Sequence, residues 1–400
     1  MAGKFLTKQG GDVDKHFFQQ LARGAVVLFA VFLSAIPVAV QQESAAGLIS
    51  TAHAKEQNAS SLALHHVRTL KNDFAITVLA WHPDGRQLAV GQVLNKRIAI
   101  WDTQTGKLVR TLEKEGGGVH ALIYSPDGKY LAVGREFSRL TKERAHVHLY
   151  DAMSGNLLQS FPPSSPAVSN ASDAEALAFS PDSRYLAASG HGSRRAVVVY
   201  DIVSKSMFAH TPDVPRGGVT INALAFSPDG RFLAIGRNIG TLEVWLMKPW
   251  KLHKNLEGQS AGVRALAFTP DSKYLASGTD IGVRYRSYGN ERRPWFDKYT
   301  DDLVLWSIPA FEKVREFPSR HFTHTPISST IESLQFSPDG KLLLVSARTG
   351  SLEIIDVTSG KTALFKDGYG VVVEATLSPD GKRLALGLGK KIEIHELTAR

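Results

Sequence analysis

One four-residue stretch, Ser-Pro-Asp-Gly, recurs along this chain and limits the folds that the chain can adopt. It stands at residues 125–128, 227–230, 337–340 and 378–381, each time between two short apolar runs. Variants of this turn that share its proline complete a set of seven, at Pro83, Pro126, Pro181, Pro228, Pro270, Pro338 and Pro379. The shortest spacings between these prolines are a little over 40 residues, and such a period is typical of the blades of a β-propeller.

Each repeated unit contains four short candidate strands. An apolar run that ends in an aromatic residue precedes the turn, as in "ALAFSPDG", and "LAVG" or "LASG" follows it. A third run ends near "IWD" or "VYD", and stretches such as "TGKLVRTL" supply a fourth. Alternation with period two, bounded by Gly, Pro, Asp and Ser, indicates strands and hairpins. The sequence therefore predicts an all-β fold, a seven-bladed β-propeller of four-stranded antiparallel blades, over residues 55–400.

The residue types of the turn explain its recurrence. Proline presets φ at about −65° in the second position of a type I turn, and glycine takes the positive φ that lets the hairpin close. Aspartate accepts hydrogen bonds from nearby backbone amides. We therefore interpret the seven aspartates as turn formers, and not as a ring of metal ligands or catalytic acids.

Residues 62–400 resemble the WD40-repeat β-propellers, in a divergent bacterial, exported form. The resemblance rests on the period, on the "LAFSPDG" and "LASG" segments, and on the ends of the third strands, where Trp101-Asp102 is the literal dipeptide and Trp245 and Trp306 keep the tryptophan. The Gly-His dipeptide that precedes a typical repeat of the family is missing, with only Gly258-Gln259 near its place. The family's hydrogen-bonded Asp-His-Ser/Thr-Trp network is therefore in question here.

The two ends of the chain predict how the ring closes. The last unit has only three strands, at residues 371–377, 383–387 and 390–396, whereas residues 64–70 match the fourth-strand text "KLVRTL" of residues 107–112. An N-terminal strand within residues 62–70 should therefore complete blade 7 and remove an exposed sheet edge.

The insertions are distributed unevenly among the loops. The loops between second and third strands are long at residues 135–146 and 279–302, and the connections between units are long at 162–174, 210–220 and 318–330. In a four-stranded meander both classes of loop emerge at the same end of the blade. One end is thus plain and the other elaborated, which is typical of a binding face.

Mostly polar residues stand six positions before each motif proline, at the start of each first strand: Thr77, His120, Glu175, Asn222, Arg264, Glu332 and Val373. The resemblance to WD40 proteins implies that this position lines the mouth of the central channel and contacts the partner. A polar rim solvated by water is the plainer alternative. A third interpretation makes the histidine, the asparagine and the two glutamates a metal or catalytic cluster, as in lactonase-like propellers, but Arg264 in the same ring counts against it.

The long insertion of blade 5 interleaves cations with aromatic rings, and we expect its residues Arg284, Tyr285, Arg293 and Trp295 to contact a partner. Such residues can stack on nucleic acid, but an exported protein seldom meets one. Trp, Tyr and Arg also dominate the binding energy of protein interfaces. A protein partner or an anionic envelope polymer is therefore expected; the alternative is a loop that packs its own aromatic rings.

Cysteine content and the N-terminus bear on chemistry and compartment. The chain has 400 residues, a formal net charge of +9 and no cysteine, which excludes disulfides, thiolate metal sites and catalytic thiols. Residues 25–40 carry no charge; this run is short for a spanning helix and suits the apolar region of a secretory signal. Ala52-His53-Ala54 offers a cleavage site before Lys55. We expect residues 1–54 to be a signal peptide and the propeller to be periplasmic or otherwise extracytoplasmic; the alternative is an uncleaved inner-membrane anchor at residues 25–40.

Two functions from different classes follow from these observations. The first is a non-catalytic protein-interaction scaffold of the bacterial cell envelope, with no cofactor and with another protein or an envelope complex as its partner. The second is a metal-dependent propeller hydrolase with its site at the channel mouth. The sequence contains no Walker loop, no dinucleotide-binding glycine pattern and no Gly-x-Ser-x-Gly elbow, so nothing points to the enzymes that these motifs mark.

Overall fold

The computed structural model describes residues 61–92, 97–112, 117–135, 147–161, 174–189, 196–212, 219–257, 259, 261–280, 284–288, 291–295, 302–318, 330–348, 350–370, 372 and 374–400. These residues form strands and turns and contain no helix. It follows that the described part has no helix long and apolar enough to cross a membrane.

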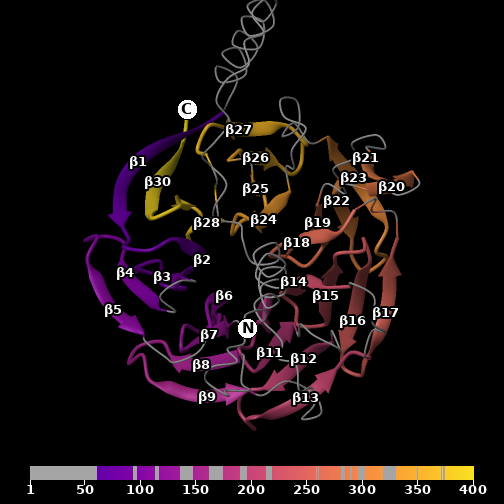
Figure 1. The fold of residues 1–400 in the computed structure, drawn as a ribbon, viewed down its shortest axis with the longest axis horizontal. Coiled ribbons are helices and arrows are strands. Elements are labelled where there is room, and N and C mark those ends of the chain that lie inside the picture. The colour runs from indigo at the N-terminus through magenta and orange to yellow at the C-terminus, as the bar shows by residue number, and fades with distance from the viewer. Residues whose placement is uncertain are drawn as a thin grey trace, which may run out of the picture. The chain divides into compact units, whose positions relative to one another are not determined.

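Seven four-stranded antiparallel sheets are arranged in a ring, as predicted (Figure 1). Blade 1 contains β2 (Ile76–Trp81), β3 (Gln87–Gln92), β4 (Ile98–Asp102) and β5 (Leu108–Leu112). Blade 2 contains β6 (Val119–Tyr124), β7 (Tyr130–Arg135), β8 (Val147–Asp151) and β9 (Leu157–Phe161). Blade 3 contains β10 (Leu177–Phe179), β11 (Tyr185–Ser189), β12 (Val197–Asp201) and β13 (Ser206–His210).

The remaining four blades follow in chain order. Blade 4 contains β14 (Ile221–Phe226), β15 (Phe232–Arg237), β16 (Leu242–Met247) and β17 (Trp250–Leu256). Blade 5 contains β18 (Val263–Phe268), β19 (Tyr274–Thr279), β22 (Asp302–Ser307) and β23 (Lys313–Pro318). Blade 6 contains β24 (Ile331–Phe336), β25 (Leu342–Ala347), β26 (Leu352–Asp356) and β27 (Thr362–Lys366). Blade 7 contains β28 (Glu374–Leu377), β29 (Arg383–Leu388), β30 (Lys391–Ala399) and β1 (Leu62–Lys71).

The hydrophobic core lies between neighbouring blades. Val78 and Ile98 of blade 1 belong to the same buried cluster as Leu122 and Val133 of blade 2. Clusters of the same kind join blades 4 and 5, blades 5 and 6, and blades 6 and 7. Blades 2 and 3, 3 and 4, and 7 and 1 share such clusters as well, so every blade buries apolar side chains against both of its neighbours in the ring.

Blade 7 is completed from the two ends of the chain, and this prediction is confirmed. Strand β1 pairs antiparallel with β30, with Leu62 opposite Ala399 and Lys71 opposite Lys391. The first strand of the blade, β28, begins at Glu374, so the described strand is shorter at its N-terminal end than the predicted 371–377. The N-terminal strand therefore closes the ring and covers the edge that β30 would otherwise expose.

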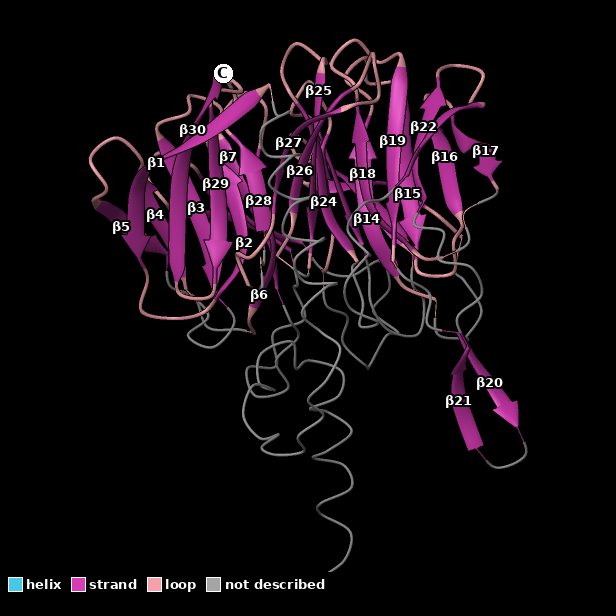
Figure 2. Ribbon diagram, turned by 90° about the horizontal axis from the view of Figure 1, so that it is seen from above, coloured by secondary structure: helices cyan, strands magenta, loops and turns pink. Residues whose placement is uncertain are grey.

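The insertion of blade 5 contains a hairpin of its own. Strands β20 (Arg284–Tyr288) and β21 (Glu291–Trp295) pair antiparallel as a separate two-stranded sheet. Figure 2 shows this hairpin outside the blade sheets, and β19 pairs directly with β22 across the insertion. The insertion is thus added to the blade without disturbing its four-stranded meander.

Candidate functional site

The recurrent turns lie at one end of the blades, here called the turn end, and their polar groups are satisfied locally. In the blade 6 turn, the Ser337 hydroxyl donates to Asp339 Oδ1 at 2.6 Å, and the Lys341 amide donates to the same oxygen at 3.1 Å. These hydrogen bonds hold the pKa of Asp339 below its ordinary value, because they favour the charged form. Gly340 closes the turn with φ +71°. The interpretation of these aspartates as turn formers is confirmed.

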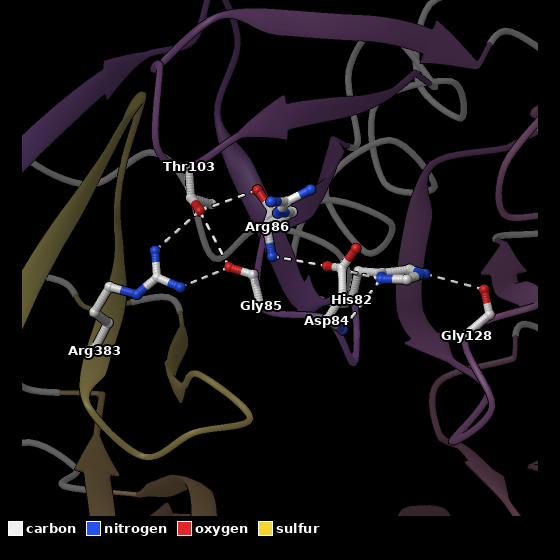
Figure 3. A network of polar contacts seen from close by, with 7 residues as sticks. All are labelled: His82, Asp84, Gly85, Arg86, Thr103, Gly128 and Arg383. Carbon is white, nitrogen blue, oxygen red and sulfur yellow. Dashed lines mark hydrogen bonds and ion pairs between the residues drawn. The ribbon is translucent and has the colours of Figure 1, made fainter.

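Blades 7, 1 and 2 are also joined to one another at the turn end (Figure 3). Arg383 of blade 7 donates to the Gly85 carbonyl at 2.6 Å and to the Thr103 hydroxyl at 3.1 Å, both in blade 1. His82 takes the place that serine or threonine has in the other turns, and its Nε2 lies 3.0 Å from the Gly128 carbonyl of blade 2. The polar groups at this end thus serve to hold the ring together.

The opposite end, here called the insertion end, is built on a repeated β-bulge. In five of the innermost strands the second residue has no partner in the register with the next strand. These bulged residues are Thr77, His120, Asn222, Arg264 and Glu332. They coincide with five of the residues predicted to contact a partner. A bulge redirects a side chain and is common beside functional sites.

Thr77 and Asn222 use the bulge to connect blades. The Thr77 hydroxyl donates to the Val119 carbonyl of blade 2 at 2.8 Å, and Asn222 Nδ2 donates to the Val263 carbonyl of blade 5 at 3.3 Å. Both side chains therefore hydrogen-bond a backbone carbonyl on the inner strand of the neighbouring blade. His120 makes no such connection, because its Nε2 is buried without a hydrogen-bond partner among the described residues.

Blades 5 and 6 carry charged residues at the bulge instead. Arg264 Nε lies 3.3 Å from Asp280 Oδ2, and the Thr330 hydroxyl donates to Asp280 Oδ1 at 2.5 Å. In the next blade, Arg348 Nε lies 3.6 Å from Glu332 Oε1. The four charged side chains of these ion pairs are each between 25% and 34% exposed. Blades 5 and 6 thus present two neighbouring and partly solvated ion pairs of mixed sign.

A further carboxyl group extends this cluster to blade 7. Burial raises the pKa of Glu332, while Arg264 and Arg348 act in the opposite direction. Burial also raises the pKa of Glu374 to about 8; the Leu79 amide of blade 1 donates to its carboxylate and opposes the shift, and the charge of Glu332 adds to it. We call Arg264, Asp280, Glu332, Arg348 and Glu374 the charged arc.

Sequence reasoning missed Asp280, Arg348 and Glu374. Asp280 and Arg348 directly follow the second strands of their blades, where their amides donate to the Gly262 and Thr330 carbonyls. The sequence could have indicated both residues through their position immediately after a "LASG"-like strand. Glu374 lies five residues before the motif proline. The spacing rule selected its neighbour Val373, which lies outside the described residues.

Glu175 is placed apart from these ion pairs. It precedes β10 as an exposed residue, and its amide is 3.2 Å from the Ser189 hydroxyl. Among the described residues, no three His, Asp or Glu side chains gather closely enough to hold a metal ion.

The other predicted contact residues lie on the blade 5 hairpin. Arg284 of β20 is opposite Trp295 of β21 in the register, Tyr285 is opposite Pro294, and Arg293 also belongs to β21. The hairpin pairing thus brings Arg284 and Trp295 together across two strands. Residues 136–146 of the blade 2 insertion and residues 281–283, 289–290 and 296–301 of the blade 5 insertion lie outside the described residues.

One blade retains part of the hydrogen-bond network that the sequence left in question. Trp306 Nε1 donates to the Ser277 hydroxyl at 2.8 Å, and Gln259 Nε2 lies 2.5 Å from the same oxygen. A glutamine that precedes the inner strand thus stands where the family has its histidine. Two family models match the chain: the WD domain, G-beta repeat, at residues 106–139, 206–245 and 250–284, and the anaphase-promoting complex subunit 4 WD40 domain, at residues 49–117 and 320–367. The chain is a WD40-repeat β-propeller.

The segments of this WD40 propeller that the G-beta repeat model matches do not start and end at blade boundaries. The match at 206–245 starts on β13, the outer strand of blade 3, and continues through the first three strands of blade 4. A sequence repeat therefore spans two blades. No curated protein matches the chain. WD40 propellers typically act as protein-interaction scaffolds, so the family supports that class of function.

Proposed function

We propose that this propeller is a non-catalytic scaffold of the bacterial cell envelope, and that it binds a protein partner at the insertion end, over the charged arc. The observation that carries the proposal is the contrast between the two ends. At the turn end the aspartates are committed to hydrogen bonds within the turns. At the insertion end Arg264 and Glu332 stand on bulges, in ion pairs that remain partly exposed.

The geometry of these ion pairs suits exchange with a partner. Exposed ion pairs contribute only about 0–1 kcal/mol to stability, so a partner's charges can replace them at small cost to the fold. The ion pairs of the arc hold both signs, Arg264 and Arg348 against Asp280 and Glu332. A mixed pattern of this kind favours a protein surface of complementary charges over a polymer of one sign, because charge complementarity fixes register and excludes wrong partners.

We expect Arg264→Ala or Trp295→Ala to weaken partner binding about thirtyfold without unfolding the ring. Interface energy is concentrated in a few Trp, Tyr and Arg residues, and truncation of one commonly costs about 2 kcal/mol. The partner would be captured from envelope extract on the immobilised protein, identified by mass spectrometry, and then titrated against each variant.

The matched control for this titration is Lys129→Ala at the turn end. Lys129 is a highly exposed cation paired with Asp127 at 3.1 Å, so it resembles Arg264 in charge but lies at the other end of the blade. Its loss should leave binding unchanged. If Lys129→Ala weakened binding while Arg264→Ala and Trp295→Ala did not, the binding face would be the turn end and this proposal would fail.

The envelope location rests on the N-terminal sequence, and its test is separate. We expect the mature protein to begin near Lys55, because the uncharged run at residues 25–40 is followed by Ala52-His53-Ala54. N-terminal sequencing of protein from the extracytoplasmic fraction checks this. A chain that still began at residue 1 or 2 and remained in the inner-membrane fraction would show that the segment is an anchor.

A further inference from the structure

The outer strands of the blades contain a second repeated β-bulge, and in blades 1, 2 and 3 it exposes apolar side chains; in β5 of blade 1 these are Leu108 and Val109, 49% and 42% exposed. In β9 the register passes from Leu157 to Gln159 and leaves Leu158 unpaired; in β13 it passes from Met207 to Ala209 and leaves Phe208 unpaired. A regular strand alternates its side chains between two faces. The bulge interrupts the alternation, so that two successive residues reach solvent.

The apolar patch that results is extended by the turns that precede these strands. Met153 is 84% exposed and Val203 is 77% exposed, and the four residues of the two bulged pairs are between 38% and 48% exposed. We call these residues the rim patch: Met153, Leu157, Leu158, Val203, Met207 and Phe208. Strands β9 and β13 are the outer strands of neighbouring blades and follow one another along the outside of the ring (Figure 1).

The size of the rim patch is that of an interface core. Large side chains have about 150–250 Å² of surface, so the six expose on the order of 500 Å². This is at the upper end of the ~300–600 Å² of the largest apolar patch on a typical monomer. A standard interface buries ~800 Å² per partner, of which the apolar centre is only a part. The patch can therefore supply the centre of a stable interface.

The charges around the rim patch distinguish between possible partners. Residues 151–161 and 201–210 contain only three Asp, Glu, Lys or Arg residues: Asp151, Asp201 and Lys205. Asp151 accepts hydrogen bonds from the amide and hydroxyl of Ser154, and Asp201 pairs with Arg184 at 2.9 Å. A lipid surface or polyanion is normally bound through clustered Lys and Arg. Two cations from outside these segments also lie beside the patch: Arg110 of blade 1 donates to the Met153 carbonyl, and Arg184 is the partner of Asp201. These single cations do not form such a cluster, although the chain as a whole carries +9.

We infer that the rim patch is a self-association surface, at which blade 2 of one copy packs against blade 3 of a second copy. An interface between identical copies with two-fold symmetry must be complementary to itself. The internal repeat provides this, because Leu157 and Met207 occupy the same register position, opposite Tyr150 and Tyr200. The two copies would meet without repulsion, since the patch has almost no net charge. This surface is distinct from the insertion end and does not depend on the proposed function.

Sedimentation velocity of the full chain over a range of concentrations tests this inference. The wild-type chain should form a dimer, and Leu157→Glu combined with Met207→Glu should raise its dissociation constant about a hundredfold, because two carboxylates would be buried at an apolar contact. The control is Leu252→Glu. Leu252 of β17 occupies the same register position in blade 4, opposite Trp245, and is 42% exposed, but its neighbour at the bulge is His253.

Cross-linking then locates the contact, because the chain has no cysteine of its own. A short bis-maleimide should join Leu157→Cys chains to Met207→Cys chains far more than Leu157→Cys chains to Leu252→Cys chains. A chain that stayed monomeric at every concentration would overturn the inference. Equal cross-linking to both cysteines, or association with anionic vesicles that the double glutamate variant abolishes while no dimer forms, would overturn it as well.

Discussion

Removal of residues 62–70 should abolish most of the cooperative unfolding of this propeller, although these residues precede the first full repeat. Strand β1 supplies the whole fourth strand of blade 7, and without it β30 has an open edge. Leu70 is buried among Ile76, Ile392 and Ile394. A buried leucine alone contributes about 2–5 kcal/mol when truncated to alanine, and the deletion also removes a complete set of backbone hydrogen bonds. The total stability of a domain is only about 5–15 kcal/mol.

The deletion also releases a link between blades 7 and 1. Arg68 of β1 donates to the carbonyls of Gln104 and Thr105 in the turn that precedes β5. Loss of this link lets the two blades separate at the junction where the ring closes. We therefore expect the truncated protein to unfold over a broad range and to aggregate through the edge of β30.

Thermal unfolding followed by far-ultraviolet circular dichroism measures the effect. Two substitutions within the strand provide a matched pair: Leu70→Ala removes a buried side chain, whereas Val67→Ala removes one that is half exposed. Leu70→Ala should lower the melting temperature by several degrees and Val67→Ala should hardly change it. A melting temperature unchanged by the deletion would mean that the ring closes without β1.

The sequence predicted the architecture because every blade repeats the same local information. The turn residues, the period of alternation and the apolar fourth-strand text of residues 64–70 each act over a few neighbouring positions. They identified the blades and the closing strand with errors of a few residues at strand ends, as at β28, which begins at Glu374. Repetition made these weak local signals reliable.

The charged arc could be predicted only in part, because it depends on contacts between blades. The motif spacing identified Arg264 and Glu332, but nothing local to either residue indicates the bulge that redirects it. The bulge arises from pairing with the second strand, where Val263 is opposite Thr279 and Ala265 is opposite Gly278. Asp280 and Arg348 become partners of these residues only once that pairing exists.

Glu374 illustrates the same limit. It stands five residues before the motif proline, where the other six blades have small or apolar residues: Val78, Ala121, Ala176, Ala223, Ala265 and Ser333. A comparison of the repeats with one another would have singled it out as the only ionisable residue at this position. Its environment, near the Leu79 amide and Glu332, follows from the closure of the ring.

We expect Glu374→Gln to stabilise the protein above neutral pH. The folded pKa of Glu374 is about 8, against an ordinary value of 4.5. Between these values the folded protein holds a proton that the unfolded chain has released, so the stability of the wild type falls as pH rises from about 4.5 to 8 and is level above that. One pKa unit corresponds to about 1.4 kcal/mol; because the side chain is partly exposed to water, we expect a gain of at least about 1 kcal/mol at pH 8.

Denaturant unfolding of both proteins at several pH values measures this gain. The amide of glutamine has no proton to lose and can still accept from the Leu79 amide. The free energy of unfolding of the variant should therefore increasingly exceed that of the wild type as the pH rises from 4.5 to 8. Glu396→Gln, at an exposed position of β30 in the same blade, should leave the difference flat. Parallel curves for Glu374→Gln and wild type would show that Glu374 is ionised at neutral pH. The same measurement bears on binding, because a partner cation placed beside Glu374 and Glu332 would favour their charged forms, and binding would then tighten over the pH range in which the free protein loses stability.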